Sequence, residues 1–138
     1  MHLTAFTDYG MRVMMLLAGE PDRLFTIGDM AEELEISRNH LTKIIHRLGK
    51  ADYIKTRRGK GGGFSMGLDS RSITLKDIVV WLEPEMAFVE CFRKDGGNCT
   101  LMPTCYLRGC LKNAKKAFLD ELGKTTLYEC AIPKKIES

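Results

Sequence analysis

The sequence predicts a mainly α-helical protein with a small β-wing, built as a winged helix-turn-helix domain plus a long C-terminal dimerisation helix. Three observations predict this fold. Two short amphipathic helical patterns follow each other closely before residue 51, a glycine run separates two strand patterns, and a helical pattern returns after a cysteine-containing loop. We expect residues 1–70 to form the winged helix-turn-helix domain and residues 71–138 to hold the cysteine loop and the dimerisation helix.

Apolar spacing and capping residues predict the helices of the first domain. An apolar stripe over residues 4–18 stops before Pro21 and predicts the first helix. Thr26 followed by Asp29 has the spacing of a capping box and opens a second, short helix. Ser37 is placed to cap a third helix, whose apolar residues recur at the spacing of one buried face: Leu41, Ile44, Ile45 and Leu48. This spacing leaves most polar residues of the helix, Arg47 included, near or on its open face.

Turn residues place the wing and the helix that follows it. We expect strands over residues 53–58 and 64–68, joined by a tip that is mostly glycine, which is the shape of a wing. Thr74 and Asp77 form a second capping box, and the helix that they open should end near Pro84.

The second half combines a loop with a long terminal helix. Residues 91–105 contain three cysteines, two adjacent glycines and a proline without clear periodicity, which is typical of a loop wrapped around something. A helix over residues 106–122 carries an apolar stripe that is long for a terminal helix and is therefore a candidate dimer contact. The stripe consists of Leu107, Leu111, Ala114, Phe118 and Leu122.

Basic side chains concentrate in the third helix and the wing. The net charge of +3 is too small to indicate a nucleic-acid partner, but residues 37–60 carry eight lysines and arginines against a single aspartate. A helix that begins with such side chains can reach base edges in a major groove, and a basic hairpin can reach phosphates. Each charge alone would be explained equally well by a solvated surface, whereas their order along the chain predicts binding to double-stranded DNA. The candidate DNA-binding residues are Arg38, Asn39, His40 and Lys43 in the helix and Arg57, Arg58 and Lys60 in the wing.

Other classes of protein fit the sequence less well. The glycine run is not a nucleotide-binding loop, because its lysine is followed by glycine and not by serine or threonine. His2, His40 and His46 are scattered and assemble no catalytic group, so we do not expect an enzyme, and we expect His46 to be interior or partly buried. No apolar run is long enough to span a bilayer and the N-terminus lacks signal-peptide features, so we expect a cytoplasmic protein.

Five cysteines in a cytoplasmic chain favour metal binding or redox chemistry over a disulfide framework. Cys91, Cys99 and Cys105 share one short loop, and Cys110 follows on the last helix. Thiolates suit zinc, copper(I) or iron–sulfur clusters, and structural zinc sites more often use closely spaced pairs. The spacing leaves iron–sulfur binding, zinc binding and thiol–disulfide switching open. Cys110 is interpreted as a core residue or a spare ligand, and Cys130 as a core residue.

Three motifs together resemble those of the NsrR-type repressors in the Rrf-type family of winged-helix, iron–sulfur regulators. They are LTAFTDYGMR at residues 3–12, SRNH with KII at residues 37–45, and RGKGGG at residues 58–63. The resemblance covers nearly the whole chain. It implies a homodimer joined by its C-terminal helices, a palindromic operator, and one iron–sulfur cluster per subunit, a 4Fe-4S cluster in preference to 2Fe-2S.

The resemblance also implies particular ligands. Matched position by position, they are Cys91, Cys99 and Cys105, with Asp8 of the opposite subunit as the fourth. Without the resemblance, Asp8 and Arg12 would be an ordinary helix ion pair worth about 0.3–0.5 kcal/mol. The implied function is a transcriptional repressor of nitric-oxide detoxification genes. Its cluster would tie the loop of one subunit to the first helix of the other until nitric oxide breaks that tie.

Two departures from the NsrR pattern keep alternatives open. The gap between Cys91 and Cys99 looks like that of the iron-responsive RirA branch of the same family, and Cys110 and Cys130 are extra. The alternatives are an iron- or redox-responsive regulator of the same family and a zinc- or thiol-based DNA-binding regulator.

Overall fold

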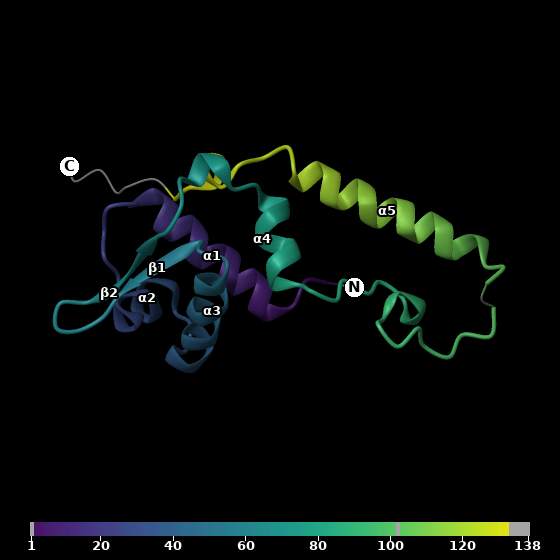
Figure 1. Ribbon diagram of the computed structural model, residues 1–138, viewed down its shortest axis with the longest axis horizontal. Helices are drawn as coiled ribbons and strands as arrows, with labels where there is room; N and C mark the ends of the chain where they lie inside the picture. The colour runs from purple at the N-terminus through teal and green to yellow at the C-terminus, as the bar shows by residue number, and fades with distance from the viewer. Residues whose placement is uncertain (1, 102, 133–138) are drawn as a thin grey trace.

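The computed structural model describes residues 2–101 and 103–132, and it arranges them as a helical bundle with a hairpin at one end and a separate long helix at the other (Figure 1). The main elements, in chain order, are α1 (Ala5–Gly19), α2 (Ile27–Leu34), α3 (Arg38–Lys50), β1 (Ile54–Arg57), β2 (Gly63–Met66), α4 (Leu75–Leu82) and α5 (Tyr106–Leu122). Single turns of 3-10 helix occur at η1 (Ser70–Ser72), η2 (Glu90–Phe92) and η3 (Leu127–Cys130). The mainly helical fold with a small wing is the one that the sequence predicts.

The predicted capping residues begin their helices as expected. Thr26 and Asp29 form both hydrogen bonds of a capping box at the start of α2. The Ser37 hydroxyl accepts a hydrogen bond from the backbone N–H of His40 at the start of α3. Between these helices, Glu35 takes a left-handed conformation with φ of 54° and turns the chain sharply. Local sequence therefore determines where the two helices begin.

The wing is a two-stranded antiparallel hairpin that is anchored to the bundle at its base. Ile54 pairs with Met66, and Arg57 pairs with Gly63. Phe25 and Phe64 exchange two backbone hydrogen bonds of 2.8 Å. A β-carbon at Gly63 would collide with the carbonyl oxygen of Phe25, so this close approach requires glycine. Both strands are shorter than predicted, because β1 lacks one residue at each end and β2, although it begins one residue earlier at Gly63, already ends at Met66.

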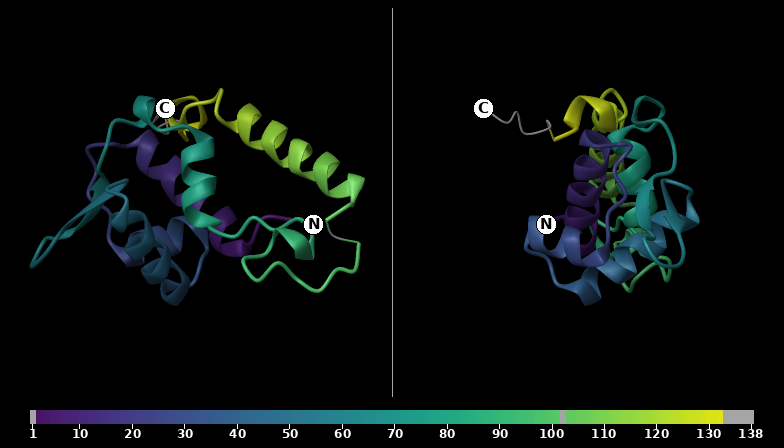
Figure 2. Two further views of the ribbon diagram at one scale, coloured as in Figure 1. Left: turned by 45° about the vertical axis from the view of Figure 1, so that its right-hand side comes forward. Right: turned by 90° about the vertical axis from the view of Figure 1, so that its left-hand side faces the viewer.

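α1 is the centre of the hydrophobic core. It packs against α3, α4 and η3, and Figure 2 shows α1 in purple alongside α4 in both views. Met14 and Leu17 of α1 are fully buried, as are Ile78 of α4 and Leu127 of η3. The N–H of Leu127 donates to the carbonyl of Ile73, so the chain returns from α5 to the start of α4. The segment between α4 and η3, which contains the cysteine loop and α5, is therefore anchored to the core at both ends.

α5 lies apart from this core (Figure 1). The helix predicted over residues 106–122 is confirmed, and none of its residues is buried in the described chain. Its predicted apolar stripe is accordingly open, with Leu107 62% exposed and Phe118 37% exposed. No helix in the described ranges is long and apolar enough to cross a membrane.

Candidate nucleic-acid interface and metal centre

The first turns of α3 present the predicted base-reading side chains. Arg38, Asn39, His40 and Lys43 are all exposed. The His40 ring makes an edge-on contact with Tyr9 of α1, with ring centroids 5.4 Å apart. The imidazole is therefore braced by the core helix while it stays open to solvent, which orients it for contact with a ligand.

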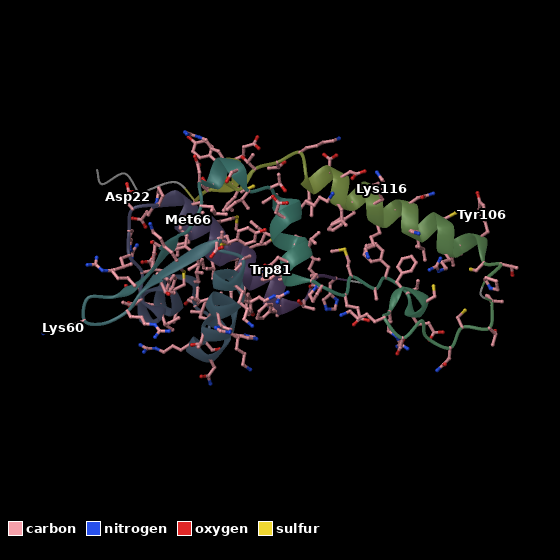
Figure 3. All side chains as sticks on the ribbon, viewed as in Figure 1. Asp22, Lys60, Met66, Trp81, Tyr106 and Lys116 are labelled. Carbon is pink, nitrogen blue, oxygen red and sulfur yellow. The ribbon has the colours of Figure 1, made fainter. Side chains whose placement is uncertain are left out.

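The wing extends the basic surface beyond the bundle. Arg57, Arg58 and Lys60 are exposed, and Figure 3 shows Lys60 at the tip of the hairpin. Gly59 and Gly61 have φ of 96° and 75°, in the region that favours glycine, and they allow the tight tip. The geometry suits contact with a phosphate backbone, because flexible basic side chains stand at the end of a narrow projection.

Two residues of α3 lie differently from expectation. His46, expected to be interior or partly buried, is exposed and lines a groove between α3 and the wing. It is exposed because the helix turns its neighbours Ile44, Ile45 and Leu48 toward the core. Arg47, expected near or on the open face, is half-buried against α4.

Arg47 is held by a reciprocal contact with Trp81. Its Nη2 and Nε donate to the carbonyl oxygen of Trp81 at 2.9 and 3.3 Å, and the indole N–H donates back to the carbonyl oxygen of Arg47 at 2.7 Å. The guanidinium carbon also lies 3.9 Å from the centroid of the indole ring. Figure 3 shows Trp81 between α3 and α4. The pair joins α3 to the helix that leads into the cysteine loop.

A second contact ties the end of α4 to the beginning of α1. One carboxylate oxygen of Glu83 accepts hydrogen bonds of 2.7 Å from both the backbone N–H and the hydroxyl of Thr4, the N-cap residue of α1. Partial burial acts to raise the pKa of Glu83, but the hydrogen bonds from Thr4 outweigh it and hold that pKa below the ordinary value of 4.5. Glu83 is therefore a charged clamp between two helices.

The cysteine loop has the expected irregular path. Cys91, Cys99 and Cys105 are half-buried free thiols, while Cys110 on α5 is exposed. Within residues 2–101 and 103–132, no three histidine, cysteine or acidic side chains converge as a metal site. A cluster would therefore require the three loop thiols to come together.

The donor set and its surroundings nevertheless fit an iron–sulfur cluster. Three thiols on one irregular loop match the ligand chemistry of a polynuclear cluster. The Nε–H of Arg108, three residues after Cys105, is buried without a hydrogen-bond partner among the described residues. This unpaired donor lies in the first turn of the helix that Cys105 begins, and it suits an acceptor held by the loop.

Asp8 lies in the first turn of α1 and is half-exposed. Its carboxylate makes a two-point ion pair with Arg12, with N–O distances of 3.0 and 3.1 Å, and both side chains are 47% exposed. Asp8 also lines a small cavity of about 220 Å³ together with Met15 and Cys130. No loop cysteine is among the described residues that line this cavity. Within one chain, Asp8 and the three loop thiols therefore do not form a common site.

Trp81, Glu83 and Arg108 were not predicted from the sequence as functional residues. The position of Glu83 directly after an amphipathic helix carries no signal for a partner 79 residues away. Trp81 is the only tryptophan in the chain, which was a hint of a specific role but not of a particular partner. Their roles depend on contacts between elements that are distant in the sequence.

Comparison with known proteins agrees with the geometry. Residues 3–131 match the model of the Rrf2 family, described as an iron-dependent transcriptional regulator. The chain is 42% identical over 130 residues to the HTH-type transcriptional regulator NsrR of Bacillus subtilis (strain 168), a match that spans 94% of this chain and 89% of the relative. It is 38% identical over 130 residues to the regulator of the same name from Bacillus licheniformis, spanning 94% of this chain and 91% of the relative.

Solved structures show the same fold. CymR, the global cysteine regulator of B. subtilis, superposes with a TM-score of 0.75 over 95% of this chain and 96% of its own, at 22% sequence identity. At that identity the likeness concerns the fold alone, and the shared fold is that of a winged-helix regulator.

Proposed function

The chain belongs to the Rrf2 family and is a transcriptional regulator, and from this premise we propose that it is a repressor whose operator affinity is controlled by an iron–sulfur cluster that senses nitric oxide. The observation that carries the proposal is the union, in one chain, of an exposed basic helix and wing with three free thiols on one loop. Relatives named NsrR, 38–42% identical over nearly the whole chain, favour the nitric-oxide branch.

α3 and the wing are the proposed DNA-binding elements. Asn39 and Arg38 stand at the capped end of α3, where short and long polar side chains can reach base edges in the major groove. Lys60 and its neighbours Arg57 and Arg58 would neutralise phosphates. His40 and Lys43 complete the helix surface. Members of the Rrf2 family are transcriptional regulators and not enzymes. The proposed role of these side chains is therefore to bind DNA.

Cys91, Cys99 and Cys105 would hold one cluster per subunit, a 4Fe-4S cluster in preference to 2Fe-2S. When bound, the cluster supplies iron atoms that react with nitric oxide. Asp8 would provide the fourth, harder ligand from the opposite subunit. The exposed position of Asp8 on α1 supports this, because its carboxylate is open to a second copy of the chain.

We propose that α5 pairs with its counterpart in a homodimer. Its stripe exposes Leu107 and Phe118 in a helix that buries none of its residues in its own chain. Water contact along such a stripe is unfavourable, and a second copy of the same helix offers a matching apolar surface. A dimer would present two α3 helices to a palindromic operator.

The contacts within the chain provide a path from the loop to α3. Glu83 begins the segment that leads to Cys91 and holds the start of α1, the helix that carries Asp8. Two residues before Glu83, Trp81 is hydrogen bonded to Arg47 of α3. A change in the loop would therefore bear on both α1 and α3, and so on the spacing of the two DNA-reading helices.

The proposal is tested on protein purified without oxygen. The visible absorption and the affinity for operator DNA are followed on one sample through a nitric-oxide titration. We expect a brown chromophore that bleaches as DNA is released. A colourless protein that holds DNA regardless of nitric oxide would overturn the cluster and leave a winged-helix regulator with zinc- or thiol-based control.

Matched variants identify the ligands. Cys91→Ser, Cys99→Ser and Cys105→Ser should each lower the iron content, whereas Cys110→Ser, on the exposed face of α5, should retain it. Asp8→Ala should retain the fold, because an exposed ion pair is lost at a cost below about 1 kcal/mol, but should change the response to nitric oxide. Full occupancy with an unchanged response would remove Asp8 from the ligand set.

A second candidate function is control by iron availability. The long gap between Cys91 and Cys99 and the family description of iron dependence favour it. Operator binding is measured while a chelator removes iron in the absence of nitric oxide. DNA release at mild chelation, with little effect of nitric oxide on the intact protein, would favour iron as the signal.

A further inference from the structure

The side chain of Arg108 on the first turn of α5 has a buried donor that nothing in the described chain satisfies. Its Nε is shielded from solvent and makes no hydrogen bond to any described residue. A guanidinium N–H is a strong donor, and buried polar groups of folded proteins are almost always paired. The environment of this atom is therefore complete only when an acceptor lies beside it.

Arg108 lies close to two of the proposed ligands, through a contact with the residue that follows Cys91 and through its place on the helix that Cys105 begins. The guanidinium carbon lies 5.8 Å from the ring centroid of Phe92, the residue after Cys91. Arg108 is also three residues after Cys105, the N-cap residue of α5. Arg108 thus links the two ends of the cysteine loop, because its backbone follows Cys105 and its side chain reaches the residue after Cys91. The Nζ of Lys115, about two turns further along α5, lies 5.9 Å from the same Phe92 ring.

The charge at this end of α5 suits an anion. The first turn contains no acidic residue, and Cys105 makes no side-chain capping hydrogen bond. The backbone N–H groups of the first turn and the helix dipole therefore add to the positive charge of Arg108. A cluster held by three thiolates carries negative charge on its sulfurs, and hydrogen bonds to those sulfurs are among the features that set its reduction potential.

We propose that Arg108 donates its Nε–H to a sulfur of the cluster, either a Cys thiolate or a bridging sulfide, and so stabilises the bound cluster. This inference rests on the proposed function, because it requires that a cluster is bound. Arg108 is a positioning residue and not a ligand. The Phe92 ring lies beside the guanidinium, and the ammonium group of Lys115 approaches the same ring.

The test compares Arg108→Gln with Lys115→Gln in protein loaded with its cluster without oxygen. Both substitutions remove one cation from the Phe92 ring, but only the first removes the buried donor. We expect Arg108→Gln to lose its visible absorption about tenfold faster in the presence of a chelator, in line with the loss of other outer contacts of metal sites. Its reduction potential should fall, because the reduced cluster, with one more negative charge, loses more from the missing donor. Lys115→Gln should match the parent in both measurements.

The outcomes separate the two proposals. Parent protein that binds no cluster overturns the proposed function and this inference with it. A cluster that is equally stable, with equal potential, in the parent and in Arg108→Gln overturns the role of Arg108 alone. If the glutamine variant does not fold, Arg108→Lys is measured instead. It keeps the charge but loses the guanidinium Nε, so a lowered potential is expected, and an unchanged potential with unchanged cluster lifetime counts against the inference.

Discussion

Arg47 and Trp81 exchange hydrogen bonds through each other's backbone carbonyls, and the guanidinium covers the indole ring at 3.9 Å. The pair joins α3 to α4 across 34 residues of sequence. Because each side chain donates a hydrogen bond to the backbone carbonyl of the other residue, the contact fixes the relative position of the two helices and not merely of the two side chains.

Trp81→Phe keeps an aromatic ring under Arg47 but removes the N–H that donates to its carbonyl, and we expect the free energy of unfolding to fall by about 1 kcal/mol. Urea unfolding measures the change. Val80→Ala, at the exposed neighbouring position, should have a much smaller effect. Operator affinity of Trp81→Phe should also fall, and an unchanged affinity would show that α4 does not position α3.

Lys60 should contribute to DNA binding through phosphate contact alone. We expect Lys60→Ala to weaken binding to all sequences and to reduce the salt dependence of log Kobs by about 0.9, the value for one phosphate. Titrations at several salt concentrations give this slope. Lys116→Ala is the control, because Lys116 is exposed on α5, far from Lys60 (Figure 3). If Lys60→Ala and Lys116→Ala show the same salt dependence of log Kobs, Lys60 at the wing tip does not contact a phosphate.

Asn39 should act differently, by reading a base. Asn39→Ala is expected to reduce discrimination between the operator and a mismatched site by about 1–3 kcal/mol while it leaves the salt slope unchanged. Competition binding with operator and scrambled duplexes measures the ratio. A uniform loss of affinity on both duplexes would instead place Asn39 against the DNA backbone.

Glu83 should make stability depend on pH. Its pKa is lowered in the folded protein, despite the opposing effect of burial, by the hydrogen bonds from Thr4. A carboxylate with a lowered folded pKa stabilises the protein above its unfolded pKa, and that contribution is lost as the pH falls through the folded pKa. We expect Glu83→Gln to be less stable than the parent at pH 7, by at most about 1 kcal/mol because the clamp is partly exposed.

The same variant provides the control for that prediction. The difference in unfolding free energy between Glu83→Gln and the parent should begin to shrink as the pH falls below the ordinary carboxyl pKa of 4.5, and should be lost below the lowered folded pKa, where the folded carboxylate is protonated. Urea unfolding at a series of pH values gives both curves. A difference that stays constant with pH would show that the contribution of Glu83 does not depend on its charge.

If α5 joins the two subunits, a charged residue placed on its apolar stripe should weaken the dimer. We expect Leu111→Asp to convert the dimer to a monomer, because a carboxylate would then lie at an apolar contact between two copies. Sedimentation equilibrium reports the mass. Asn113→Asp, an exposed position off the stripe on the same helix, should remain dimeric. If both variants stay dimeric, another surface joins the subunits.

Local sequence determined the boundaries of the helices. Capping pairs such as Thr26 with Asp29 and Thr74 with Asp77 act within one helical turn, so their chemistry can be read directly from the chain, and both capping boxes are present. The buried face of α3 and the extent of α5 also followed from periodicity alone. The wing was predicted from its glycine tip, although its strands proved shorter at their ends.

Only the tertiary structure decided which polar side chains find partners. His46 is exposed and Arg47 half-buried, the reverse of what their places on α3 suggested, because α4 packs beside one and not the other. The clamp between Glu83 and Thr4 and the orphaned Nε of Arg108 likewise depend on elements far apart in sequence. Helix starts are decided by hydrogen bonds within a few residues, whereas the pairing of a side chain depends on where distant backbone comes to lie, and no local pattern specifies that.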